Sequence, residues 1–215
     1  NDYMEAQKVL DEAHPAYSDI SDKIYALFSS SGKGTSNSSA VDSLKKSKQT
    51  LDEKFDKLSK MKAITGDKKV KEKWDKLNAK RDKFNKMIDF SIELSEKVLP
   101  TYFKVLQIDS YSTVSDINRM ITDIENISIS DTDTKQMMTE AANYLRAARD
   151  YANAKSSSSY SYDSSAYDKY MDAADRFEAA HKKWTNSVDK RTDEAQIKDE
   201  VNDLIEELSH KGKDS

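Results

Sequence analysis

The chain has 215 residues, of which 34% are charged and 36% are hydrophobic, and its formal net charge is −4. Such a composition is lean in apolar residues for a compact globule and is typical of helices that expose most of their surface. Four glycines and two prolines leave little for the turns of sheets and nucleotide-binding loops, and the absence of cysteine excludes disulfides, thiolate nucleophiles and cysteine-ligated metals.

The first expected helix spans residues 2–29. Pro15 should break or kink it near His14, because proline lacks an amide hydrogen and crowds the preceding turn. The following segment 29–40, "SSSGKGTSNSSA", holds half of the glycines and predicts a flexible loop. The apolar stripe of this helix consists of Val9, Ala13, Ile20, Ile24, Leu27 and Phe28.

Two helices over 41–64 and 68–99 follow, with apolar residues at alternating spacings of four and three, as in coiled coils. Between them, Gly66 suits a left-handed C-cap and Asp67 suits the cap of the next helix. Gly66 is either a hairpin turn or a soft position in one long rod, and we favour the turn. The stripes are Leu44, Leu51, Phe55 and Leu58, with Lys48 at one seam position, and then Val70, Trp74, Leu77, Arg81, Phe84 and Ile88.

Pro100 suits the first turn of a new helix. Further helices are expected over 112–128 and 134–155, and the longest over 165–209. The apolar phase of the last helix slips by one residue, which predicts a stutter or break near Thr192–Asp193. The serines of residues 155–164 predict a second flexible spacer, and Tyr167 and Tyr170 fall in phase with the core stripe.

These elements predict an all-α protein: an elongated bundle of five or six helices with coiled-coil-like packing, forming a single domain over residues 1–215. Each stripe is narrow, so each helix needs neighbours to bury it. No stretch is apolar enough to span a bilayer; the most apolar run, residues 98–108, is short and contains Pro100 and Lys104.

The charge is divided unevenly along the chain. Residues 43–86 hold 16 basic and 7 acidic side chains, whereas residues 101–215 hold 15 and 22. A basic hairpin of this kind indicates a surface for a polyanion such as anionic lipid head groups or teichoic acid. The candidate residues for a polyanion or partner are Lys68, Lys69, Lys71, Lys73, Lys76, Lys80, Arg81 and Lys83, together with Tyr160 and Tyr162, since exposed tyrosines are common interface anchors.

Two structural explanations compete with this hypothesis. The basic and acidic helices can pack together, or the lysines can pair along their own helices at i, i+4, as in Glu53–Lys57, Asp56–Lys60, Glu72–Lys76 and Asp82–Lys86. Nucleic acid is not expected as a partner, because Arg81 is the only arginine in the basic stretch and arginine is the residue that forks onto phosphates and guanine edges.

The nearest approach to a metal or catalytic motif is Glu178 with His181, because Glu-x-x-His places both side chains on one helix face, as in di-iron bundles. Each of the three histidines has an acid three residues earlier, but acids are so frequent here that such matches are common. His181 also lies in the apolar seam between Phe177 and Trp184, where a hydrogen-bonded core histidine is the more ordinary interpretation. No cofactor is therefore expected.

The functional expectation is a non-catalytic, exported bacterial protein, tethered to the membrane or the wall, that binds or scaffolds a protein or an anionic wall or membrane polymer. The lack of cysteine favours export, and the start at Asn1 leads us to expect a signal peptide or lipoprotein leader before it. The alternatives are a metal-binding or catalytic bundle that uses Glu178 and His181, and a cytosolic coiled-coil adaptor.

Overall fold

The computed structural model describes residues 1–18, 20–29, 38–157 and 164–213. Of these residues, 88% are helical and none lies in a strand, so the predicted all-α class is confirmed. Most of the expected loop 29–40, and Tyr160 and Tyr162 of the expected binding surface, lie outside the described residues. None of the described helices combines the length and the apolar character that a membrane crossing requires.

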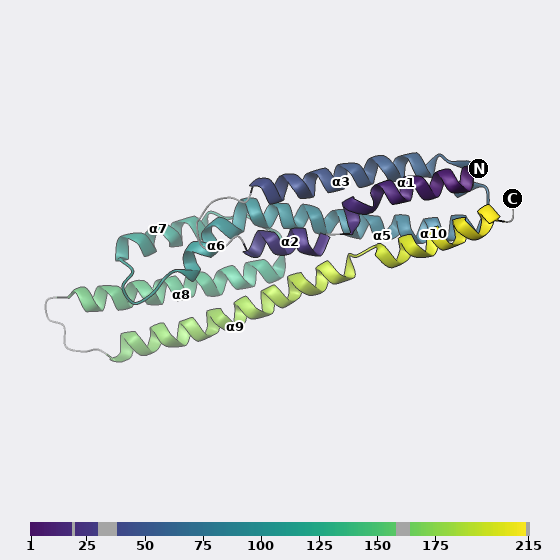
Figure 1. Cartoon of the computed structure of the whole chain (residues 1–215). Helices are drawn as coiled ribbons and strands as arrows, with labels where there is room; N and C mark the ends of the chain where they lie inside the picture. Colours follow the sequence, from purple (N-terminus) through teal and green to yellow (C-terminus); the bar gives the residue numbers. More distant parts are fainter. Residues whose placement is uncertain (19, 30–37, 158–163, 214–215) are drawn as a thin grey trace. The chain divides into compact units, whose positions relative to one another are not determined.

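The helices fall into two compact units (Figure 1). The described residues of 1–29, 38–92 and 191–213 form unit 1, and those of 93–157 and 164–190 form unit 2. The expectation of one domain over residues 1–215 stays a prediction. Unit 1 contains α1 (Asp2–Tyr17), α2 (Ile20–Ser29), α3 (Ser38–Ser59), α4 (Lys62–Thr65), nearly all of α5 (Lys68–Glu93), the end of α9 (Ser164–Glu194) and α10 (Lys198–Lys213). Unit 2 contains η1 (Leu94–Val98), α6 (Leu99–Leu106), α7 (Val114–Glu125), α8 (Thr132–Ser156) and most of α9.

The N-terminal helix breaks later than proline chemistry predicts. Pro15 lies inside α1, which continues to Tyr17, and α2 begins at Ile20. The Pro15 carbonyl, near the end of α1, accepts a hydrogen bond from Lys23 Nζ at 3.3 Å. One expected helix is therefore two, which is one reason why the described residues contain more helical segments than the five or six expected.

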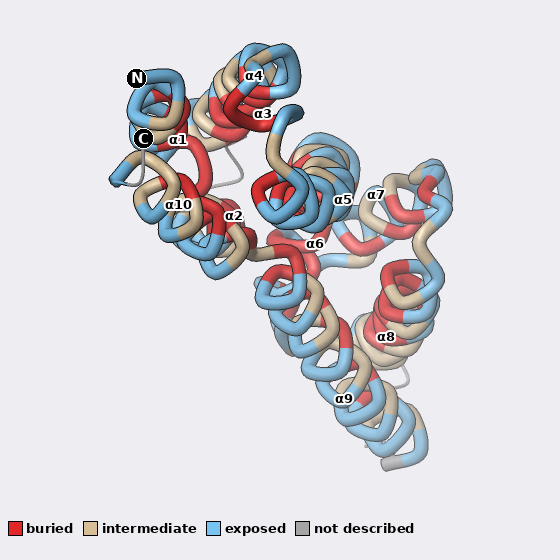
Figure 2. Tube along the Cα trace, turned by 90° about the vertical axis from the view of Figure 1, so that its right-hand side faces the viewer, coloured by how far each residue is buried: buried red, intermediate tan, exposed pale blue. Residues whose placement is uncertain are grey.

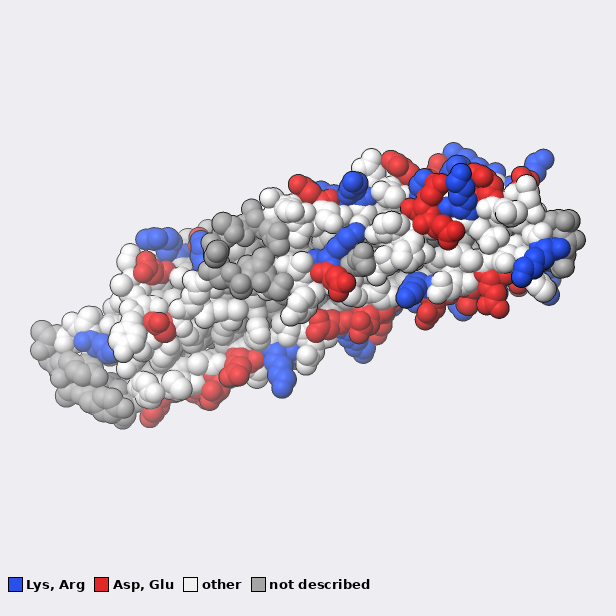
Figure 3. Space-filling model, in the orientation of Figure 1, with Lys and Arg blue, Asp and Glu red and all other residues white. Residues whose placement is uncertain are grey.

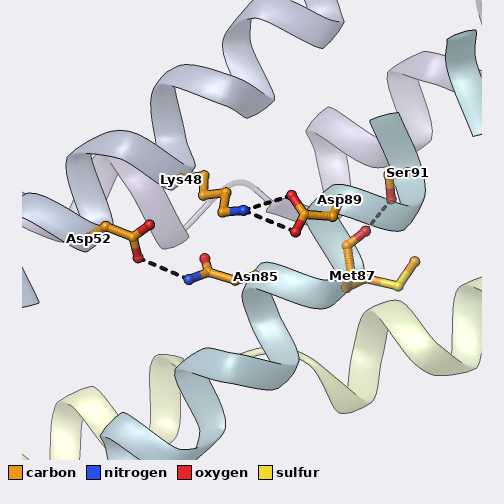
Figure 4. Close-up of polar contacts among 6 residues, drawn as sticks. All are labelled: Lys48, Asp52, Asn85, Met87, Asp89 and Ser91. Atoms are coloured by element: carbon orange, nitrogen blue, oxygen red, sulfur yellow. Dashed lines mark hydrogen bonds and ion pairs between the residues drawn. The ribbon is translucent and has the colours of Figure 1, made fainter. Parts of the chain in front are cut away.

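The segment around Gly66 is a turn of a helical hairpin. Lys48 Nζ on α3 contacts both carboxylate oxygens of Asp89 on α5, at 2.8 and 2.9 Å, and Asn85 Nδ2 donates to Asp52 Oδ1 at 2.9 Å (Figure 4). From the first pair to the second, the α3 residue changes from Lys48 to Asp52, later in the chain, and the α5 residue from Asp89 to Asn85, earlier in the chain. The two helices are therefore antiparallel.

Of the two cap residues predicted at this turn, one has the expected conformation or contact and the other does not. Asp67 accepts the amide hydrogen of Val70 at 3.1 Å, so its predicted capping role is confirmed. The predicted left-handed conformation of Gly66 is wrong: its φ is −89° and its ψ is −17°. The short helix α4 continues in the right-handed sense to this residue, whose amide donates to Lys62 O at 2.8 Å.

The apolar stripes of the hairpin are buried, as their spacing predicts. Figure 2 shows buried residues along one side of α3 and of α5. The two polar residues at seam positions, Lys48 and Arg81, are only half-buried and place their charged ends against acids of the facing helix. The fully or nearly buried stripe residues are Leu44, Leu51, Phe55, Leu58, Val70, Trp74, Leu77, Phe84 and Ile88.

A π-helical turn joins α5 to α6. Pro100 occupies the first turn of α6, as predicted, and the amide of Leu99 donates to Leu94 O in the wider register. Because proline has no amide hydrogen, the ordinary bond to the residue four positions earlier is absent at this point. The helix continues through the π turn without a loop.

The predicted break in the last helix is also confirmed. α9 ends at Glu194, one residue after Thr192–Asp193, and α10 begins at Lys198. Ala195 closes the turn, because its amide donates to Arg191 O at 3.1 Å and to Thr192 O at 3.2 Å. Ile197, Val201, Leu204 and Leu208 are buried in the new phase.

Candidate functional site

The structure places all eight basic candidates on α5, and half of them are in ion pairs. One pair lies within the helix and three join α5 to acids elsewhere in unit 1. These pairs are Lys71–Asp75 at 2.9 Å, Lys80–Glu200 at 2.8 Å, Arg81–Asp52 at 3.7 Å and Lys83–Glu194 at 3.7 Å. Glu194 at the end of α9 and Glu200 of α10 thus neutralise part of the basic stretch. This agrees with the explanation that the basic and acidic helices pack together.

The other structural explanation accounts for little of the charge. Of the four i, i+4 pairs expected from the sequence, Asp56–Lys60 forms, at 3.1 Å. Lys57 instead approaches Glu5 of α1 at 3.9 Å, and Glu53 accepts a hydrogen bond from Gln49. Within α5, intrahelical pairing therefore neutralises one of the candidate lysines, Lys71, through a pair with Asp75 that the sequence analysis did not expect.

Five lysines share one face of α5 and are called here the lysine row: Lys69, Lys73, Lys76, Lys80 and Lys83. Their spacings of four and three residues keep them on one side of a helix, over about 21 Å at about 1.5 Å per residue. Lys73 lines the same groove as residues of α10, while Lys80 and Lys83 pair with Glu200 and Glu194, so the row lies on the side of α5 next to α10.

The row is divided into two parts. Lys69, Lys73 and Lys76 are exposed, and none of the three has a side-chain ion pair or hydrogen bond with another described residue. Lys80 and Lys83, at the other end, are held by carboxylates. Lys68 immediately precedes Lys69 in the sequence and does not belong to the row. It is also exposed and has no ion pair within the described part of the chain.

The groove beside the row has a volume of about 670 Å³ and carries both signs of charge. Lys73 lines it from α5, and α10 contributes Asp203, Glu206, Glu207, His210 and Lys213. Ammonium and carboxylate groups thus both line the groove, and both also lie over the face of the molecule shown in Figure 3. Such a surface offers exposed point charges.

A second groove, of about 540 Å³, lies between α3 and α5. Its charges are compensated internally, because Lys48 binds Asp89 through both carboxylate oxygens and Asp52 accepts from Asn85 (Figure 4). Ser91, behind it, donates to Met87 O at 2.7 Å. The polar groups on this groove serve the hairpin, and we assign no ligand to it.

His181 is a partner of aromatic side chains in unit 2. Its ring stacks on Tyr102 of α6, with centroids 5.4 Å apart and planes 10° apart, and its Nδ1 shares a hydrogen bond with the Tyr102 hydroxyl. Burial lowers the pKa of His181, against the opposite effect of Glu178, which is itself exposed. Across the described residues, no three His, Asp or Glu side chains form a group that could hold a metal ion.

The tyrosines of the last helix differ in burial. Tyr170 is buried and stacks between Tyr144 and Tyr151, whereas Tyr167 is half-buried and meets Tyr151 edge-on. The core position predicted for Tyr170 is confirmed, and Tyr167 lies at its margin. These rings fill the space between α8 and α9.

The sequence analysis does not identify two residues of the site, Glu194 and Glu200. The acids of the last helix are recognisable as a group, but nothing in their spacing says that they face α5, 120 residues away in the case of Lys80 and Glu200. The one available signal is that Glu200 lies next to Val201 in the apolar stripe, which places it at the edge of a packed face.

Comparison of the chain with protein-family models, with curated proteins and with solved structures gives no match.

Proposed function

We propose that this chain is a non-catalytic helical binding protein that acts outside the cytoplasm, and that its lysine row contacts an anionic polymer of the cell wall or membrane. The observation that carries the proposal is the run of three exposed lysines, Lys69, Lys73 and Lys76, on one face of α5 with no acidic partner among the described residues. Coiled-coil-like packing of the α3–α5 hairpin would provide the rigid support, and export and tethering belong to the same proposal.

The chemistry of the row favours a polymer over a compact anion. Lysine ammonium groups are strongly hydrated point charges that make no bidentate fork, so a row of them recognises charge and spacing more than shape. Charges spread along a helix match a ligand that lies parallel to it. Each polymer charge that a lysine neutralises releases a counterion, so binding should weaken steeply with salt.

Salt-dependent binding to long-chain polyphosphate tests the proposal. The triple variant K69Q/K73Q/K76Q should bind more weakly, and the slope of log K against log salt should fall by about three, one for each lysine removed. The matched control is K135Q/K169Q/K182Q, which removes three exposed lysines of unit 2 and changes the net charge equally. Equal losses in the two variants would mean that net charge, and not the row, determines binding, and would overturn the proposal.

The compartment requires a separate measurement. Protease added to intact cells should digest the protein if it is exposed outside the membrane, whereas a cytosolic marker in the same cells should survive. Survival of both would contradict the extracytoplasmic part of the proposal and favour the cytosolic adaptor.

A further inference from the structure

Glu200 of α10 forms an ion pair with Lys80 of the lysine row. Its Oε1 lies 2.8 Å from Lys80 Nζ, and the Glu200 side chain is only 13% exposed, against 32% for Lys80. The other ion pair of the row, Lys83–Glu194, is more exposed and longer: its side chains are 57% and 45% exposed and its distance is 3.7 Å.

The second oxygen of the same carboxylate is poorly satisfied. Glu200 Oε2 is buried and has no hydrogen-bond partner in the described structure. An ionised carboxylate can accept about four hydrogen bonds, and a buried charge is stabilised only when its lone pairs are satisfied. Lys80 is therefore the one side chain among the described residues that hydrogen-bonds this carboxylate.

The two acids that pair with the row lie on either side of a break in the helix. Glu194 and Glu200 flank the break between α9 and α10, where residues 195–197 are not helical. Glu194 at the end of α9 and Glu200 in the first turn of α10 both bind lysines at the same end of the row. The three unpaired lysines lie at the other end, so the row is partly covered from one side.

On these grounds we propose that Glu200 is a built-in anionic competitor of the lysine row, an autoinhibitory contact that an anionic polymer displaces from Lys80 when it engages the whole row. The inference rests on the proposed function and adds its regulation. A polymer that contacts Lys69, Lys73 and Lys76 already lies next to Lys80, so its local concentration there is high and it competes effectively with a single carboxylate.

The variant E200Q tests this inference with long-chain polyphosphate as the probe. It should bind about two- to fivefold more tightly than the wild type at low salt, the size of one partly exposed ion pair, and its salt slope should rise by about one. The control D199N removes the adjacent acid, which is exposed and has no ion pair with a described residue. An equal gain in D199N would assign the effect to net charge and overturn the inference.

A double variant separates competition from a change in folding. If Glu200 acts by covering Lys80, E200Q should give no gain in a K80Q background, whereas a general electrostatic effect would persist there. Circular dichroism melts of each variant establish that the helices are intact. If the inference fails, K69Q/K73Q/K76Q binds polyphosphate more weakly than the wild type while E200Q binds it equally well. If the proposed function fails, the triple variant binds polyphosphate as well as its control does.

Discussion

Tyr102 and His181, 79 residues apart in the chain, form a stacked and hydrogen-bonded pair in unit 2. Tyr102 is 5% exposed and also meets Trp184 edge-on, with centroids 5.1 Å apart. Burial raises the pKa of the Tyr102 phenol and lowers the pKa of the His181 imidazole. Both shifts favour the neutral forms of the two groups, and the tautomer of His181 decides which of them donates the hydrogen bond.

This pair predicts that unit 2 loses stability in mild acid. The pKa of His181 in the folded protein lies below its ordinary value of 6.5, so the unfolded chain binds more protons than the folded chain once the pH approaches and falls below that value. The free energy of unfolding should accordingly decrease as the pH falls below about 6.5. Urea unfolding followed by tryptophan fluorescence between pH 8 and pH 5 measures it.

The variant H181F is the appropriate comparison, because phenylalanine keeps the stacked ring and cannot titrate. Its unfolding free energy should be nearly independent of pH in this window, while H210Q, which changes an exposed histidine of α10, should follow the wild type. Glu12 and Asp67, whose pKa values are lowered by lysine and backbone hydrogen bonds, lose their contribution only at lower pH. An unchanged acid dependence in H181F would contradict the prediction.

The two tryptophans predict different costs for the same substitution. Trp184 is 1% exposed and its Nε1–H donates to Thr134 Oγ1 at 2.9 Å, while that hydroxyl donates to Asp131 Oδ2 at 2.7 Å. W184F removes the indole N–H, so the buried Thr134 hydroxyl oxygen loses this hydrogen bond. W74F changes a buried tryptophan of unit 1 whose indole nitrogen has no hydrogen bond to a described residue.

We therefore expect W184F to lower the unfolding free energy by about 1 kcal/mol more than W74F, the net value of one buried hydrogen bond. Chemical denaturation of both variants, followed by circular dichroism, gives the comparison. Equal losses would show that ring volume alone accounts for the effect and that the Thr134 contact contributes nothing.

The hairpin of α3 and α5 predicts that apolar burial outweighs its ion pairs. Leu51 is fully buried, so L51A should cost about 2–5 kcal/mol through lost transfer energy and the cavity left behind. Lys48 and Asp89 are 33% and 58% exposed, so K48M should cost less than about 1 kcal/mol. Urea midpoints of the two variants decide it, and a larger loss in K48M would mean that the polar contacts of Figure 4 hold the hairpin.

Hydrophobic periodicity explains why much of the helical layout follows from the sequence. The four–three spacing of Leu51, Phe55 and Leu58 identifies the buried side of α3. The slip in the apolar phase before Ile197 locates the end of α9. In both cases the information lies within one or two turns of the helix. Pro15 shows the limit of the same local reasoning. Its effect depends on the two residues after it, which stay helical, so the break comes later than proline chemistry alone implies.

The candidate site depends on contacts that no local pattern contains. The excess of basic residues over 43–86 predicts a basic hairpin, but whether Lys76 is unpaired and Lys80 is neutralised depends on where α10 lies. The same holds for His181: its place in the seam predicts a core histidine, while its partner Tyr102 is on another helix. Side-chain partners across helices are set by tertiary packing, and single-sequence periodicity carries no record of it.

Gly66 provides a prediction that depends on backbone geometry alone. A Cβ built on this glycine would lie 2.8 Å from the carbonyl oxygen of Lys62, closer than such atoms approach, although its φ of −89° is open to any residue. G66A should therefore lower the unfolding free energy by about 1 kcal/mol, the strain energy of a small local backbone distortion. G212A is the control, because the nearest atoms to its Cβ are 3.7 Å away.

The variant G66N distinguishes the two conformations of this turn. Asparagine tolerates the left-handed region much better than alanine, so at a left-handed position it would recover part of the loss. In the right-handed conformation both residues carry the same Cβ into the Lys62 carbonyl, and asparagine should destabilise the protein at least as much as alanine. Thermal melts of G66A, G66N and G212A measure the difference, and a clear advantage of asparagine over alanine would contradict the right-handed turn.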